Sequence, residues 1–186
     1  MNRPNKIPTV ADNWQKAILA YKEPLVRNAI WEMKYRGNRE ITKRLAKVVY
    51  EFLLAEVEDW QTFSNFIEPI IIPVPITKKR KVERGFNQSE RLSIYIDKLD
   101  RGHNFGVKLG LLEKVKETPK QSLSKSRSER LENLKGSFKV KEPEQIRGRN
   151  IIILDDVITT GATMREIKKC LKQAGARKVV GVAVAH

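Results

Sequence analysis

The segment formed by residues 150–185 constrains the fold more than any other part of this sequence. Residues 150–154 (NIIIL) are apolar and β-branched, which is typical of a buried strand. After a loop, residues 162–174 have a helical pattern that ends at Gly175, and a further apolar run follows at 179–185. This order of strand, loop, helix and strand predicts a βαβ unit with a right-handed crossover, and therefore a parallel sheet.

The N-terminal part of the chain has helical periodicity instead. Residues 12–60 are predicted to be helical, and Pro24 and Gly37 divide them into two or three helices. Their apolar face is formed by residues at helical spacing: Ile41, Leu45, Val48, Val49, Phe52 and Leu53. We expect an N-terminal helical segment, residues 1–66, that is part of the same domain as an α/β core of residues 67–186 or forms a small hood.

The middle of the chain supplies a second strand. Residues 69–76 (PIIIPVPI) indicate a short buried strand that ends in a rigid turn, and residues 89–99 indicate a helix. Residues 106–116 fit either a strand or a helix, and the serine-rich, basic residues 118–135 indicate a loop that runs into a helix. The predicted fold class is α/β, with a mostly parallel sheet flanked by helices.

The charge of the chain points to anionic partners. The 186 residues carry a net charge of +15, which favours nucleic acid, a phosphorylated small molecule or an acidic membrane surface, although a solvated basic surface explains it equally well. The single cysteine, Cys170, rules out an internal disulfide and a cysteine-based zinc ribbon. No apolar run is long enough to span a bilayer, and residues 1–13 have no signal-peptide pattern, so we expect a cytoplasmic protein without membrane insertion.

A candidate anion site lies at the predicted junction between the strand at 150–154 and the following helix. The expected loop, residues 155–161, contains Thr159, Thr160 and Gly161 and leads to Thr163 in the helix. A helix N-terminus at the carboxyl end of a parallel strand offers backbone N–H groups to a phosphate. The threonines add hydroxyl donors, and the glycine allows a close backbone approach. The pattern therefore predicts a cradle for a phosphate monoester.

Two carboxylates, Asp155 and Asp156, precede this cradle. Paired carboxylates can accept hydrogen bonds from the vicinal hydroxyls of a ribose, and they can hold a hydrated magnesium ion. A ribose 5-phosphate therefore satisfies both halves of the segment. The alternative is an acidic turn followed by a threonine N-cap, since either half alone occurs at many helix starts.

The whole string resembles the phosphoribosyl pyrophosphate (PRPP) signature of type I phosphoribosyltransferases. The resemblance implies that Asp155 and Asp156 contact the ribose hydroxyls, with magnesium nearby. It also implies a 5-phosphate site formed by the residues that follow the carboxylates: Val157, Thr159, Thr160, Gly161, Ala162 and Thr163. The spacing is also similar to that of the phosphoribosyl half of glutamine amidophosphoribosyltransferases.

Further segments narrow the resemblance to the ComF family. These segments contain Lys34-Tyr35, residues 73–75 (PVP), residues 84–88 (RGFNQ) and residues 136–138 (GSF), together with Thr118, Gln121, Arg130 and Asn133. Many ComF-like proteins begin with a four-cysteine zinc ribbon, which this sequence does not contain. Any function tied to that ribbon, such as docking to a competence helicase, is therefore not implied.

Basic residues after the strand at 69–76 are candidates for the pyrophosphate side of the site. The resemblance implies that this basic turn is the pyrophosphate loop, with contributions from Lys78, Lys79, Arg80, Lys81 and Arg84. Arginine can hold phosphate oxygens bidentately, whereas any single lysine here is better explained as a solvated charge. In related transferases a loop such as residues 121–133 closes over the substrate.

Two classes of function remain open for this sequence. In the first, the chain is an enzyme in which Asp155, Asp156 and Arg84 act on PRPP with magnesium, and a nucleophile of unknown identity displaces pyrophosphate. In the second, it is a binding module: it senses PRPP or nucleotides, or it binds single-stranded DNA. A non-catalytic variant of this second class is a protein-interaction component that joins competence proteins in DNA uptake, with the anion site as a relic. We expect Trp14, Trp31 and Trp60 to pack in the core or its rim rather than stack on bases. A homodimer is expected by analogy with relatives.

Overall fold

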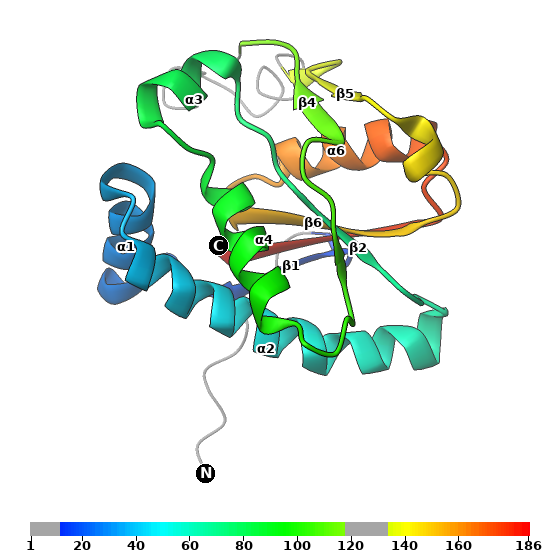
Figure 1. Ribbon diagram of the computed structural model, residues 1–186, viewed down its shortest axis with the longest axis horizontal. Helices are drawn as coiled ribbons and strands as arrows, with labels where there is room; N and C mark the ends of the chain where they lie inside the picture. Colours follow the sequence, from blue (N-terminus) through cyan, green and yellow to red (C-terminus); the bar gives the residue numbers. More distant parts are fainter. Residues whose placement is uncertain (1–11, 118–133) are drawn as a thin grey trace.

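The computed structural model describes residues 12–117 and 134–186. Five strands form one sheet in the order β1-β7-β6-β2-β3, and every neighbouring pair in it is parallel. A separate antiparallel pair joins β4 to β5. The structure thus confirms the expected α/β fold with a mostly parallel sheet flanked by helices (Figure 1).

The strands are short at the edges and longest in the centre. Their bounds are β1 Gln15–Leu19, β2 Ile70–Pro73, β3 Gly106–Val107, β4 Leu112–Lys114, β5 Phe138–Val140, β6 Asn150–Val157 and β7 Lys178–Ala185. The segment 106–116, which fitted either strand or helix, therefore holds two short strands. The parallel register of β6 and β7 pairs Ile151 with Val179 and Asp155 with Ala183, which confirms the parallel pairing predicted for the βαβ unit.

Helices cover both faces of the sheet. Their bounds are α1 Pro24–Trp31, the π-helix η1 Glu32–Arg36, α2 Arg39–Ser64, α3 Lys78–Arg84, α4 Gln88–Leu99, the short 3₁₀ helix η3 Pro143–Gln145 and α6 Ala162–Gln173. Figure 1 shows α2 along one face of the sheet and α6 along the opposite face. Alternate residues of β6 explain this arrangement, because Ile152 packs with α2 and α4 while Ile153 packs with α6.

Three sequence expectations are wrong in detail. Gln15–Leu19 is a strand rather than part of a helix, because it pairs with the exposed edge of β7. The basic segment Lys78–Arg84 is a helix rather than a turn, with Thr77 as its N-cap. β6 continues through Val157, so both carboxylates lie on the strand and not in the expected loop.

In the described parts of the chain, no helix is long and apolar enough to cross a membrane.

Candidate functional site

A cavity of about 320 Å³ lies at the carboxyl ends of β2 and β6. Its wall combines segments that are far apart in the sequence: the end of β2, α3, the start of α4, η1, the β4–β5 pair and the loop between β6 and α6. The predicted site residues that line it are Arg80, Arg84, Asp155, Asp156, Val157, Thr159, Gly161, Ala162 and Thr163. The fold therefore brings both predicted halves of the site to one place.

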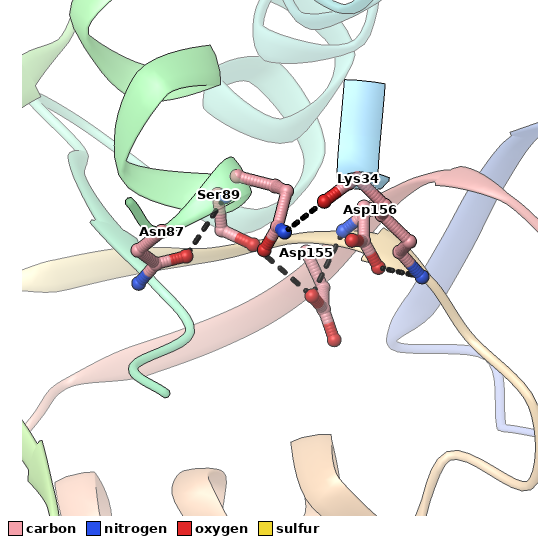
Figure 2. A network of polar contacts seen from close by, with 6 residues as sticks. Lys34, Asn87, Ser89, Asp155 and Asp156 are labelled. Atoms are coloured by element: carbon pink, nitrogen blue, oxygen red, sulfur yellow. Dashed lines mark hydrogen bonds and ion pairs between the residues drawn. The ribbon is translucent and has the colours of Figure 1, made fainter. Parts of the chain in front are cut away.

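The two carboxylates point in different directions. They are consecutive on a strand, so their side chains leave opposite faces of the sheet. Asp155 Oδ1 accepts hydrogen bonds from Ser89 Oγ at 3.1 Å and from the backbone N–H of Asp156 at 2.8 Å. Asp156 Oδ1 forms an ion pair with Lys34 Nζ at 3.0 Å, on the other side (Figure 2). Within the described residues, Asp156 thus has a cation as its direct partner, whereas Asp155 has a hydroxyl and a backbone N–H.

Burial and neighbouring charges shift the pKa values of Asp155 and Lys34. Burial, followed by the negative charge of Asp156, raises the pKa of Asp155 to about 7. For Lys34, burial alone would lower the pKa, but the carboxylate of Asp156 more than offsets it and the pKa is raised. The ammonium of Lys34 is therefore held charged at the edge of the cavity, and Asp155 is poised to lose a proton when a cation arrives.

The segment after α3 holds this arrangement in place. Asn87 donates to the carbonyl oxygen of Val74 at 3.0 Å and accepts from the N–H of Ser89 at 3.0 Å, which fixes the end of β2 against the start of α4. Gln88 Nε2 donates to the carbonyl oxygen of Lys34 at 3.2 Å. The string RGFNQ thus positions Ser89 and Lys34 toward the carboxylates (Figure 2). Our residue-level reasoning missed both, and the only signal for Lys34 was its place in the family resemblance.

The loop between β6 and α6 forms the second wall. Gly161 is the N-cap of α6 with φ +71°, a conformation that favours glycine. Gly161 has no side chain to cap this helix N-terminus, and the N–H of Ala162, the first residue of the helix, donates to Thr160 Oγ1 at 3.4 Å. The carbonyl oxygen of Thr160 accepts from Arg165 Nη2 at 2.7 Å, and Arg165 Nη1 pairs with Asp12 at 2.8 Å. Thr160 itself does not line the cavity and acts in the support of the loop.

The predicted basic wall divides into two parts. Arg80 and Arg84 lie four residues apart on α3 and both line the cavity. Lys78 is 94% exposed and faces Glu113 at 3.9 Å, and Lys79 is also exposed outside the cavity lining. The basic residues divide in this way because residues 78–84 form a helix, and only one face of a helix can point toward the cavity.

Lys114 of β4 is a cavity residue that sequence reasoning did not identify. Burial, followed by the positive charge of Arg80, lowers its pKa to about 8. Lys114 is placed at the cavity by the pairing of β4 with β5, in which it lies opposite Phe138 of the GSF segment. An anion bound between Lys114 and Arg80 would relieve the repulsion between the two cations.

Magnesium fits this site only together with a ligand. Within the described residues, no group of three or more His, Cys, Asp or Glu side chains could hold a metal ion. The cavity does contain the carboxylate of Asp155, and magnesium in phosphate sites ordinarily takes one or two carboxylates plus phosphate oxygens and water. Thr118, the expected closing loop at 121–133 and its Gln121, Arg130 and Asn133 lie outside the described residues.

The fold and the cavity define this chain as a phosphoribosyltransferase-type domain. Residues 89–186 match the family described as "Phosphoribosyl transferase domain". Competence protein F of Haemophilus influenzae is 31% identical over 170 residues, which cover 90% of this chain and 71% of that protein. The chain therefore belongs to the phosphoribosyl transferase domain family and, within it, to the group that contains competence protein F.

A further relative and a solved structure are also similar to this chain. DNA utilization protein YhgH of Escherichia coli K12 is 30% identical over 167 residues, which cover 89% of this chain and 70% of that protein. Among solved structures, the chain is similar to glutamine PRPP amidotransferase from B. subtilis complexed with ADP and GMP. That similarity has a TM-score of 0.48 and 18% identity, and covers 82% of this chain and 30% of the other.

Proposed function

We propose that the cavity binds PRPP together with magnesium and that the chain transfers the phosphoribosyl group to a nucleophile. The observation that carries this proposal is the single cavity that unites the carboxylate of Asp155, the glycine-containing loop before α6 and two arginines of α3. A 5-phosphate, a vicinal diol and a diphosphate need three such surfaces at once. PRPP is a ligand that presents all three.

In the proposed complex the 5-phosphate binds the loop that contains Thr159, Gly161 and Thr163, at the N-terminus of α6. The ribose hydroxyls donate to Asp155 and Asp156, and the diphosphate lies toward Arg80 and Arg84. Asp155 would hold magnesium, which would supply positive charge to offset part of the negative charge of the leaving group. Lys34 shares Asp156 with the ribose through their ion pair.

The proposed reaction is a substitution at C1 of the ribose. A nucleophile, which we take to be a nitrogen, forms a bond to C1 and loses its proton to solvent. The bond between C1 and the diphosphate oxygen breaks, and the diphosphate leaves with the electron pair through an oxocarbenium-like transition state. Arg80, Arg84 and Lys114 hold the leaving charge, and the cavity holds C1 in place, so rate enhancement comes from positioning and electrostatics.

The wider role that we propose is a step in DNA uptake or utilisation, carried out in the cytoplasm by a homodimer. The names of the relatives, competence protein F and DNA utilization protein, support the proposed role in DNA uptake or utilisation. Light scattering during size-exclusion chromatography tests the dimer directly.

Thermal unfolding with PRPP and magnesium tests the ligand. At a free concentration about 100 times the dissociation constant, a ligand stabilises the folded state by about 2.7 kcal/mol. For a chain of this size that raises the unfolding midpoint by roughly 5–10 °C. We expect this rise to require magnesium, and to be lost in Asp155→Asn and in Arg84→Ala.

Lys78→Ala is the matched control, because Lys78 is also a cation of α3 but points away from the cavity. It should keep the full rise in the unfolding midpoint. No rise in the wild-type chain at millimolar PRPP would overturn the proposal. A rise that Lys78→Ala abolishes and Arg84→Ala keeps would place the diphosphate on the other side of α3.

A further inference from the structure

A second surface, which shares Arg84 with the cavity wall described above, combines exposed aromatic rings with arginines. Trp31 and Tyr35 lie one turn apart at the junction of α1 and η1, with ring centroids 5.8 Å apart. The guanidinium of Arg36 lies 5.1 Å from the ring of Trp31, and that of Arg84, from α3, lies 5.4 Å from the ring of Tyr35. We call these four residues the Trp31–Tyr35 surface.

The two rings are not needed for the packing of their own segment. Ile30 and Met33 of the same segment are buried in the core against α2, whereas Trp31 is 45% exposed and Tyr35 is 61% exposed. Trp31 thus differs from the packing role that we expected for it. Trp14 and Trp60, in contrast, are partly buried against the two hydrophobic clusters, as expected. Two large exposed rings that lie next to each other, unlike a single exposed ring, mark an interaction surface.

The surroundings of the two rings are strongly basic. Arg91 stacks on Phe86 with its guanidinium 3.5 Å from the ring centroid, and Phe86 lies next to Gly37 at the end of η1. The positive charge of Arg39 is close enough to Arg91 to contribute, after burial, to lowering its pKa. Glu32 pairs with Arg36 at 3.1 Å. An anionic partner is therefore favoured over a neutral or cationic one.

We propose that the Trp31–Tyr35 surface binds single-stranded nucleic acid, with bases stacked on the two rings and phosphates paired with Arg36 and Arg84. Single strands are recognised by aromatic rings that accept the faces of the bases and by cations that follow the backbone. The sequence concealed this pattern, because Arg84 meets Tyr35 only through the packing of α3 beside η1. In duplex nucleic acid the bases are stacked on one another, so the surface selects single strands.

Arg84 links this surface to the cavity, because the same side chain lines the PRPP cavity and contacts Tyr35. A diphosphate and a nucleic-acid phosphate would compete for its guanidinium. Mutual weakening of the two ligands is therefore expected, and this part of the inference rests on the proposed function.

Fluorescence anisotropy with a labelled oligothymidylate of roughly 20 nucleotides, long enough for several stacking sites, measures binding directly. We expect Trp31→Ala and Tyr35→Ala each to raise the dissociation constant about tenfold, since stacking on one ring is worth about that factor. An oligouridylate of equal length shows whether RNA is bound as well as DNA, and a duplex should bind much more weakly. Phe63→Ala is the matched control, because Phe63 is an aromatic residue of α2 that is 84% exposed.

Unchanged affinity for the oligonucleotide in the Trp31→Ala/Tyr35→Ala double variant would overturn the proposal. Binding would then come only from diffuse attraction of the oligonucleotide to the positive charge of the chain. Binding of anionic lipid vesicles that requires both rings, without oligonucleotide binding, would overturn it in favour of a membrane surface. Far-UV circular dichroism establishes that the variants are folded. If PRPP fails to bind the wild-type chain, the proposed function fails, whereas the two ring variants still decide the nucleic-acid surface.

Discussion

At the scale of the residue, the site depends on two neighbouring carboxylates that the strand turns in opposite directions. Asp156 has Lys34 as a counterion, while Asp155 has a hydroxyl and a backbone N–H as partners. Two neighbouring aspartates therefore have different partners only one position apart. Asp155 binds its proton more tightly than an ordinary aspartate and gains most from an incoming cation.

The raised pKa of Asp155 predicts a pH-dependent effect of Asp155→Asn on the ligand-free chain. Because the folded pKa of about 7 exceeds the ordinary 3.8, the contribution of protonated Asp155 to stability is complete below about pH 3.8 and is lost progressively as the pH rises from there through about 7. Asn, which is neutral at every pH, avoids that loss. Urea unfolding should show that Asp155→Asn gains stability relative to wild type at pH 8 but changes little near pH 3.8, the ordinary pKa. Asp97→Asn, at an exposed position of α4, serves as the control. An equal effect of Asp155→Asn at both pH values would contradict the assignment.

At the scale of the element, the junction between β6 and α6 depends on a close approach of backbone and side chains. A Cβ atom on Gly161 would lie 2.5 Å from Gln15 Oε1 and 3.1 Å from Arg165 Nη1. Gln15 belongs to β1, so the edge strand and the loop between β6 and α6 restrain each other. The strand β1 thus contributes to the shape of the loop although it contributes no predicted ligand contact.

Gly161→Ala and Gly85→Ala form a matched pair for this junction. Both glycines have positive φ, +71° and +75°, so each substitution carries a backbone strain of about 1 kcal/mol. A Cβ on Gly85 would have no atom within 4 Å, whereas one on Gly161 collides with Gln15. We expect Gly161→Ala to lower the free energy of unfolding by at least about 1 kcal/mol more than Gly85→Ala. It should also lose the stabilisation by PRPP and magnesium, as measured by urea and thermal unfolding. Equal losses of stability in the two variants would show that the approach of Gln15 is unimportant.

At the scale of the whole molecule, the N-terminal helices and the sheet share one hydrophobic cluster. Leu53 of α2 is fully buried in a cluster that also contains Ile152 of β6 and Val182 of β7. The site draws on the same arrangement, since Lys34 reaches Asp156 from the N-terminal segment. The division at residues 66 and 67 stays a prediction, and its alternatives differ in how the chain unfolds.

Leu53→Ala distinguishes a single cooperative unit from two. Truncation of a buried leucine lowers the free energy of unfolding by about 3 kcal/mol. In one cooperative unit, hydrogen exchange should become faster at the amides of β6 and α6 as well as in α2. Leu25→Ala, at a residue that is 85% exposed, should change neither the free energy of unfolding nor the rate of hydrogen exchange. Faster exchange confined to α1 and α2 would support a separate N-terminal unit.

Much of the core of the fold follows from local sequence pattern. The β-branched runs at 150–154 and 179–185, with a helix between them, specify parallel strands and a crossover because burial on both faces requires continuous apolar residues. The acidic pair and the small residues after it indicated where an anionic sugar ligand would bind, since the carboxyl end of a parallel strand leads directly to a helix N-terminus.

Only the tertiary structure decided which side chains face the cavity. Lys34 and Lys114 join the cavity through contacts with segments far along the chain, and α3 turns Arg80 and Arg84 inward while Lys78 stays in solvent. The strand Gln15–Leu19 was predicted as helix because its pattern is weak, and pairing with the free edge of β7 outweighs local propensity. Local pattern determines elements through neighbouring residues, whereas a binding surface depends on packing between residues that no short stretch of sequence contains.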